Sequence, residues 1–403
     1  MKWLSKIGSF LLFPTWAKDP EDTGGGREDQ SNMRVPVVRI ALYFFFSRLL
    51  ILTVAWLSLL GVNKGSFYSP KPSVMDWFLR WDTGWFFAIA KNGYFYHPWE
   101  GSPVVFFPLY PLLVSISRLG FLDIRVAGYL VSNISLFVTC VFLWKLVRRD
   151  YGSEAAADRT VLLLLICPVS FFFSIPYSEA LFICLGVTAL YFAEGRRWIL
   201  AGICGYFVAL TKHIGVLMTV PLLVEVVVAC RRKNPAENGP GRWALPDNPL
   251  SALACLVSPV LGLGTYCLFL QVKFGSPLVF LESMSHWGRH VGFSWHSLAS
   301  GQSPFYKAWF VGSLYTALAL VCWSVVVRLR LSQSVLGPTF LLVFLLSHNV
   351  ENAPRTISVI FPFYIAPALV LTRWPRMEPL VMAFSASLLT LSVILFVNGY
   401  WFT

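Results

Sequence analysis

The chain has 403 residues, of which 56% are apolar and 13% charged, against roughly 45–50% and 25% in a typical soluble domain. A transmembrane helix needs about 20 apolar residues, so this composition excludes a soluble enzyme and predicts an all-α polytopic membrane protein. The net charge of +12 does not indicate nucleic-acid binding, because basic residues punctuate the gaps between apolar runs instead of clustering on one face.

The first 39 residues differ from the rest. A short apolar patch precedes a polar, glycine-containing stretch, which is typical of an interfacial segment followed by a flexible linker. We therefore expect residues 1–39 to be a cytoplasmic N-terminal segment and residues 40–403 to form the transmembrane domain.

Eleven apolar runs follow, and each is a candidate membrane span. Those between 159 and 230 are shorter than a bilayer and are interrupted by proline or glycine, which is tolerated only where the segment lines an enclosed or watery cavity. The runs are 36–61, 125–147, 159–176, 179–193, 197–211, 213–230, 250–272, 306–328, 334–348, 355–371 and 378–399.

Basic residues predict the orientation. With the N-terminus inside, the short cytoplasmic loops carry fourteen lysines and arginines. The outer loops, leaving out the long first one, carry five. This requires that residues 104–119, which contain two prolines, form a juxtamembrane or re-entrant helix. Residues 62–124 and 273–305 are then the large outer loops.

Histidines and carboxylates gather on the predicted outer side, which indicates a site facing that leaflet. Asp82 follows Arg80 and Trp81 just before an aromatic amphipathic helix. Judged on residue type alone, it is either the cap of that helix or a catalytic carboxylate.

Two further patterns concern charged or metal-binding residues. His286 and His290 are four apart, a spacing that suits a metal on one helix face, but no complete ligand set is evident. We expect no cofactor, with a divalent metal as the remaining candidate. Arg48 lies midway along the first run, must face the bundle, and has Glu225 as its expected partner.

Several motifs resemble those of PIG-V-type mannosyltransferases, the GPI mannosyltransferase 2 family and its prokaryotic relatives in the GT-C superfamily. The resemblance runs in the family's order from about residue 78 to 363. Two departures, Lys212-His213-Ile214 where the family has Arg-x-Asn and Thr356 where it has Tyr, bear on donor or acceptor identity. The matching segments are Arg80-Trp81-Asp82, 90–94, 106–111, Pro176-Tyr177-Ser178-Glu179, 274–280 with Trp287-Gly288-Arg289, and Arg355 with Phe361-Pro362.

The resemblance implies a GT-C fold of about 11 transmembrane helices, with juxtamembrane helices in the first outer loop. It further implies a polyprenyl (dolichyl-type) phosphate mannose donor, a lipid-linked or glycan acceptor, and transfer with inversion. The location would be the plasma membrane of a prokaryote or the endoplasmic reticulum of a eukaryote, with the site on the outer face.

Inversion by a single displacement needs one general base and no carboxylate nucleophile, and we assign the base to Asp82. Lys212, His213 and Arg355 are the expected donor-phosphate ligands. A flippase for lipid-linked sugars or polysaccharides, and a GT-C enzyme with another polyprenyl-phosphate sugar, remain the alternatives. The residues expected to bind substrate or support the site are Arg80, Trp81, Tyr177, Glu179, Trp287 and Arg289.

Overall fold

The computed structural model describes residues 34–70, 73–232, 242–243, 245–288, 292, 304–346 and 352–400. Within these ranges the elements are helical, apart from one antiparallel pairing of β1 (Arg231–Arg232) with β2 (Arg242–Trp243). The predicted all-α class is therefore confirmed for the described residues.

Six helical segments in the described ranges are long and apolar enough to cross a membrane, whereas the sequence predicted eleven spans. The other five runs form shorter helices, the longest of 16 residues, or about 24 Å against a hydrocarbon core of about 30 Å. The six are α2 (Val37–Gly61), α5 (Ile124–Tyr151), η4 with α9 (His213–Met218 and Thr219–Cys230), α10 (Pro249–Phe274), most of α13 (Pro304–Val326), and η5 with α17 (Pro375–Met377 and Glu378–Val397).

The short helices lie inside the bundle. α7 packs against α5 and α8, α8 also packs against α10, and α6 packs against α5 and α16. Most residues of α7 are buried, so these helices contact protein over much of their surface. The five are α6 (Glu154–Ile166), α7 (Glu179–Glu194), α8 (Trp198–Thr211), α14 (Leu331–Leu345) and α16 (Pro362–Arg373).

Local sequence signals set the helix ends. The Asp123 side chain accepts a hydrogen bond from the backbone N–H of Arg125 at the start of α5, as N-cap residues do. At the other end Gly152 adopts the left-handed conformation and donates its N–H to the carbonyl of Arg148. Ser153 then caps α6 through the N–H of Ala156, so the chain reverses within two residues.

Two contacts between helix termini identify the two ends of the bundle. At one, Lys64 after α2 donates to Asn398 after α17 at 2.6 Å. At the other, Arg159 of α6 pairs with Glu378 of α17 at 2.7 Å. α17 therefore runs from the second of these ends to the first, where α2 also ends. We call the first the site end and the second the distal end.

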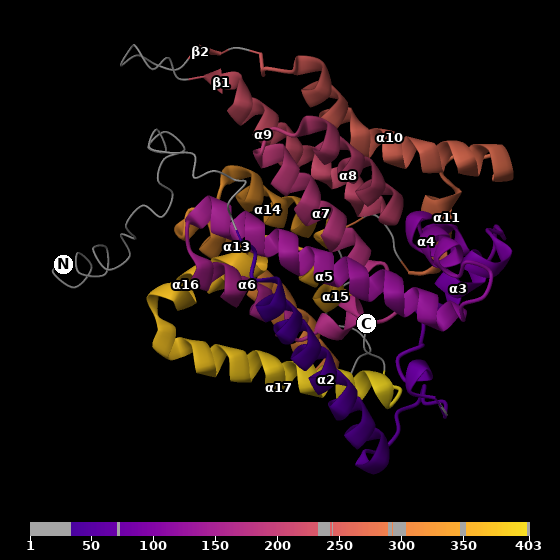
Figure 1. Cartoon of the computed structure of the whole chain (residues 1–403). Coiled ribbons are helices and arrows are strands. Elements are labelled where there is room, and N and C mark those ends of the chain that lie inside the picture. The colour runs from indigo at the N-terminus through magenta and orange to yellow at the C-terminus, as the bar shows by residue number, and fades with distance from the viewer. Residues whose placement is uncertain are drawn as a thin grey trace.

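Short elements gather at the site end, and of these α3 (Asp82–Asn92), α4 (Leu109–Ser117) and α11 (Val279–His286) lie at the right of Figure 1. α4 has nine residues and packs against α3 and α5. Residues 104–119, which contain α4, therefore form no membrane span, as the predicted orientation required. These elements are η1 (Val74–Asp76), α3 (Asp82–Asn92), η2 (Pro103–Val105), α4 (Leu109–Ser117), α11 (Val279–His286) and α15 (Ala353–Ser358).

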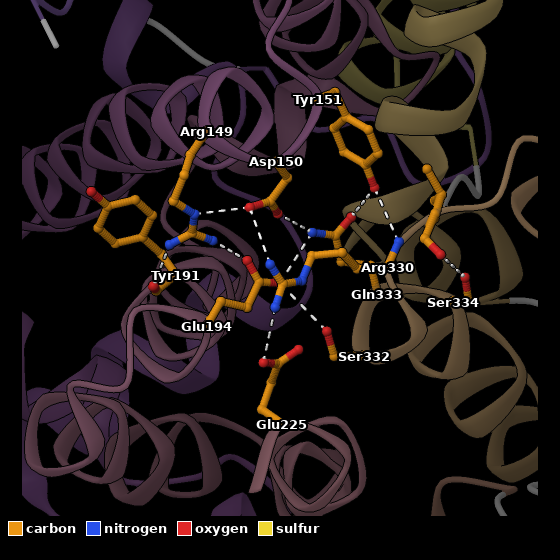
Figure 2. A network of polar contacts seen from close by, with 11 residues as sticks. Arg149, Asp150, Tyr151, Tyr191, Glu194, Glu225, Arg330, Ser332, Gln333 and Ser334 are labelled. Atoms are coloured by element: carbon orange, nitrogen blue, oxygen red, sulfur yellow. Dashed lines mark hydrogen bonds and ion pairs between the residues drawn. The ribbon is translucent and has the colours of Figure 1, made fainter. Parts of the chain in front are cut away.

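The expected pairing of Arg48 with Glu225 is wrong. The Arg48 guanidinium donates to the carbonyl oxygens of Leu165 at 2.7 Å and Ser170 at 3.2 Å, where α6 ends and η3 (Ser170–Phe173) begins. Carbonyls at a helix end lack partners within the helix, so the break itself supplies the acceptors. Glu225 pairs instead with Arg330, at 3.2 Å (Figure 2).

Candidate active site

Four charged side chains that the sequence singled out separately form one connected group at the site end. Arg355 Nη1 lies 2.7 Å from Asp82 Oδ2, and Arg355 Nε lies 2.8 Å from Glu179 Oε1. Lys212 Nζ lies 2.6 Å from the same Glu179 oxygen. We call Asp82, Glu179, Lys212 and Arg355 the site cluster. Its two carboxylates and two cations together carry no net formal charge.

Each member of the site cluster comes from a place where a helix begins or ends. Asp82 and Glu179 are the first residues of α3 and α7, Lys212 separates α8 from η4, and Arg355 lies in the six-residue α15. Helix ends carry backbone groups without intrahelical partners, which places them at the rim of a bundle. The cluster is therefore built on chain breaks at one end of the fold.

The structure bears on whether Asp82 merely caps a helix. α3 begins at Asp82 itself, and Trp81 occupies the capping position with φ 47° and ψ −111°. A positive φ is uncommon for a residue with a side chain and costs about 1–3 kcal/mol unless the surroundings enforce it. Asp82 is thus not the N-cap, and its carboxylate pairs with Arg355.

Arg80 and Tyr177 enforce this backbone conformation. The Arg80 guanidinium donates to the carbonyl oxygens of Phe67 at 3.1 Å and Val397 at 2.8 Å. The Tyr177 hydroxyl donates to the carbonyl of Arg80 at 3.0 Å. The sequence left binding and support open for Arg80, Trp81 and Tyr177; these contacts indicate that Arg80 and Tyr177 position Asp82.

Arg355 is held more firmly than a free phosphate clamp would be. Its guanidinium lies 5.2 Å from the ring of Tyr177 and 5.8 Å from that of Phe172, and its side chain is 11% exposed. Two of its nitrogens, Nη1 and Nε, are engaged by the cluster's carboxylates. The sequence predicted Arg355 as a donor-phosphate ligand. Binding two phosphate oxygens through Nη1 and Nε would compete with these ion pairs, which leaves Nη2 for a ligand.

Glu179 joins the two cations of the cluster. Its side chain is 1% exposed, and its second oxygen, Oε2, is buried without a hydrogen-bond partner among the described residues. Such an atom is unusual in a folded protein, because desolvation costs free energy. The site cluster therefore has one acceptor still unsatisfied.

Lys212 is fixed by a close backbone approach. Gly215 donates its N–H to the carbonyl of Lys212 at 2.9 Å, and a Cβ at Gly215 would lie 2.3 Å from the carbonyl oxygen of Val208. Only glycine fits there, so the turn from α8 into η4 has one geometry. Burial lowers the pKa of Lys212, and the neighbouring Glu179 opposes that shift.

The remaining predicted residues are spread around this cluster. His213 lies against the ring of Phe107, with centroids 6.2 Å apart, and Trp287 lies against Trp85 of α3 at 5.5 Å. Arg289 and His290 lie outside the described residues. His286 Nε2 is 2.9 Å from the carbonyl oxygen of Pro98. In the part of the chain that the structure describes, no three or more His, Cys, Asp or Glu could hold a metal ion.

Sequence reasoning missed Trp85 and Phe172. Phe172 forms part of the wall around Arg355. Trp85 is three residues after Asp82 in α3, and residues three apart share a helix face. That spacing from the candidate base was a usable signal for Trp85; nothing comparable pointed to Phe172.

Comparison with known proteins agrees with the motifs. The sequence profile of the family described as Mannosyltransferase (PIG-V) matches residues 69–221, which include Asp82, Glu179 and Lys212. GPI mannosyltransferase 2 of Cryptococcus neoformans is 26% identical over 209 residues, covering 48% of this chain and 47% of that protein. GPI mannosyltransferase 2 of Yarrowia lipolytica is 26% identical over 153 residues, covering 38% and 41%.

Among solved structures, the apo oligosaccharyltransferase of Archaeoglobus fulgidus superposes with a TM-score of 0.52 at 14% identity. The superposition covers 90% of this chain and 56% of that one, and it shows the fold alone. The matches span about half the length of the curated relatives or less. Over residues 69–221 the chain is similar to the PIG-V mannosyltransferases, and its fold resembles that of the archaeal oligosaccharyltransferase, which confirms the resemblance found in the sequence.

Proposed function

We propose that this homologue of the PIG-V mannosyltransferases transfers mannose from a polyprenyl (dolichyl-type) phosphate mannose to a lipid-linked or glycan acceptor, with inversion. The observation that carries the proposal is the site cluster. It sets a partly open carboxylate, Asp82, beside two cations, and gathers these groups from segments far apart in the chain.

Asp82 acts as the general base. The acceptor hydroxyl attacks the anomeric carbon, its proton passes to Asp82, and the bond from that carbon to the phosphate oxygen breaks. The Asp82 side chain keeps 20% of its surface exposed. Arg355 holds its Oδ2, which orients the carboxylate and leaves Oδ1 to accept the proton.

Lys212 and Arg355 stabilise the departing phosphate. A phosphate is already a good leaving group, so it needs cationic hydrogen-bond donors rather than a protonating acid. Lys212, whose side chain is 19% exposed, supplies an ammonium group, and Arg355 supplies its Nη2 group. Glu179 binds both cations and so fixes their spacing, the supporting one of its two expected roles. His213, next to Lys212, is the further candidate ligand.

The same proposal includes the membrane arrangement. Eleven crossings, with residues 1–39 inside and loops 62–124 and 273–305 outside, put the site cluster at the outer face. The course of α7 supports this, because the helix begins with Glu179 of the site cluster and ends with Glu194, which pairs with Arg149 in the last turn of α5. Such a protein would occupy the plasma membrane of a prokaryote or the endoplasmic reticulum of a eukaryote.

Transfer by the purified protein is the decisive test. Protein in lipid nanodiscs would be incubated with polyprenyl-phosphate mannose, and with the glucose and arabinose analogues, together with octyl α-mannopyranoside as acceptor. Mass spectrometry should show one added hexose from the mannose donor. Transfer only from another donor would show that the transferred sugar is not mannose. The absence of both transfer and donor hydrolysis would favour a flippase. The location of the cluster at helix ends argues for an enzyme, because transporters hold ionisable groups near the midplane.

A further inference from the structure

Beside the site cluster lies a group of aromatic side chains from both outer segments. Trp85 and Phe106 are nearly parallel, with an interplanar angle of 15° and centroids 6.2 Å apart. Trp287 stands almost perpendicular to both, at 82° to Trp85 and 88° to Phe106. Phe95 contacts Trp85 at 6.3 Å. We call Trp85, Phe95, Phe106 and Trp287 the aromatic platform.

The aromatic platform is contiguous with the catalytic carboxylate. Trp85 is one turn after Asp82 on α3, which puts their Cβ atoms about 5–6 Å apart on one helix face. The platform is not buried in the core, since Phe95 is 40% exposed and Trp287 36%. A molecule lying on these rings would therefore have an edge within reach of Asp82.

Trp287 is held in place before any ligand arrives. A Cβ on Gly101 would lie 2.8 Å from the indole ring, so the ring packs directly on the glycine backbone. Ser102 donates its N–H to Ser283 Oγ at 2.9 Å, and this contact fixes α11 on the first outer loop. Preorganisation of this kind lowers the entropy lost on binding.

The chemistry of the platform selects its ligand. Aromatic faces carry partial negative charge and attract the weakly positive C–H groups on the apolar face of a pyranose. The four rings carry no formal charge, so they offer nothing specific to a phosphate, which the two cations of the site cluster serve. Perpendicular rings form a corner that contacts both the face and the edge of a sugar ring.

We propose that the aromatic platform is the acceptor subsite and binds a pyranose ring, which presents its hydroxyl to Asp82. The inference rests on the proposed function and narrows it, because the acceptor is then a saccharide rather than a simple lipid alcohol. The other reading of these rings is an interfacial belt that sits among lipid headgroups.

Binding is measured first, without any reaction. Saturation-transfer NMR on protein in nanodiscs would use methyl α-mannopyranoside, with mannitol as a polyol of similar hydroxyl content but no ring. Variants are Trp287→Leu, Trp287→Phe and Trp85→Leu. Gly101→Ala displaces the indole without removing it. The matched control is Trp99→Leu, since Trp99 is 87% exposed on the same loop and lies outside the platform.

We expect the wild-type protein and Trp99→Leu to bind the mannoside alike and to ignore mannitol. Trp287→Leu, Trp85→Leu and Gly101→Ala should each raise the Kd about tenfold, and Trp287→Phe should raise it less than threefold. No binding by the wild-type protein, equal binding of mannitol, or an unchanged Kd in Trp287→Leu would overturn the proposal. Equal losses in Trp287→Leu and Trp99→Leu would identify an interfacial belt instead.

Transfer assays separate this proposal from the proposed function. With octyl α-mannopyranoside as acceptor, Trp287→Leu should raise the acceptor KM about tenfold and leave the donor KM unchanged. Mannoside binding that depends on Trp287 in a protein without transferase activity would refute the function and keep the subsite. Normal acceptor saturation in an active Trp287→Leu enzyme would refute the subsite and keep the function.

Discussion

Two charged clusters occupy opposite ends of the bundle, and they are built differently. The second joins α5, α7, α9 and α14 at the distal end (Figure 2). Arg149 pairs with Asp150 and Glu194, and Arg330 reaches Asp150, Glu194 and Glu225. We call these five residues, together with Gln333 and Tyr151, the distal cluster.

Neutral side chains complete the distal cluster. The Gln333 amide donates to Asp150 Oδ2 at 2.6 Å and to Glu194 Oε1 at 3.1 Å, and accepts from the Tyr151 hydroxyl at 2.6 Å. Among the described residues, buried polar atoms of the distal cluster all have partners, whereas Glu179 Oε2 of the site cluster has none. The distal cluster therefore satisfies its own buried charges, whereas the site cluster keeps one buried acceptor that another group could satisfy.

We predict that the two clusters face opposite sides of the membrane. Ser69 is exposed at the site end and Ala155 at the distal end. In sealed, right-side-out vesicles, Ser69→Cys should react with an impermeant maleimide and Ala155→Cys should react only after permeabilisation. The unsubstituted protein corrects for its own cysteines. Equal labelling of the two variants would contradict the topology and the location of the site.

Asp82→Asn should abolish most of the activity. The amide keeps the size of the side chain but cannot take a proton, so transfer should fall roughly 10²–10⁴-fold with little change in thermal unfolding. Asp123→Asn at the same end is the control, because asparagine still caps α5, and its rate should not change. If Asp82→Asn turns over near normally, the base lies elsewhere, with Glu179 and Glu100 next to be tested.

Arg330→Met should affect stability and not chemistry. It leaves three buried carboxylates facing the single cation Arg149, which we expect to lower the free energy of unfolding by roughly 2–4 kcal/mol. This is slightly below the loss for a fully buried pair, since the Arg330 side chain is 32% exposed. Thermal melts in detergent and kcat per folded molecule measure the two effects. Arg328→Met, at an exposed position two residues away, should be silent; a kcat loss in Arg330→Met without a lower Tm would contradict a packing role.

Arg355→Lys has the smallest expected effect, about a 10–100-fold loss of transfer. The ammonium keeps the charge but cannot bridge Asp82 and Glu179 as a planar guanidinium does. Arg125→Lys is a matched control, because Arg125 also bridges two carboxylates at the site end, those of Asp76 and Asp123. Full activity of both Arg355→Lys and Lys212→Ala would rule out these cations as phosphate ligands and leave His213 as the remaining candidate.

The sequence predicted much of the arrangement around the site. Apolar runs located the helices, and the bias of basic residues brought Asp82, Glu179, Lys212 and Arg355 to one face. Their ion pairs were not predictable, because each partner lies on another element and the contact depends on where α15 and α7 begin. The short length of α6, α7 and α8 was expected from the interrupted runs between 159 and 230. α14 and α16 were expected as full spans and are shorter, since hydropathy reports burial but not whether the neighbour is lipid or protein.

The distal cluster escaped prediction for a related reason. Asp150, Glu194 and Arg330 lie at the ends of apolar runs, where charged residues are expected at the membrane surface. Glu225 was the one clear signal of this cluster, because it is an acidic residue inside the apolar run 213–230. It was predicted to pair with Arg48, a charged residue inside another apolar run. Only the position of the break after α6 shows that Arg48 is satisfied by carbonyl groups.

In both clusters, the last charged member to be synthesised is an arginine that links carboxylates. Arg330 follows Glu225 by 105 residues, and Arg355 follows Lys212 by 143. Until Arg330 is synthesised, the only cation of the distal cluster is Arg149, which faces Asp150, Glu194 and Glu225. In the same way, the two acids of the site cluster have only Lys212 until Arg355 is synthesised. The earlier helices can therefore still shift against one another. We expect the ion pairs at the two ends of the bundle to be complete only when α14 and α15 have been synthesised and pack against them.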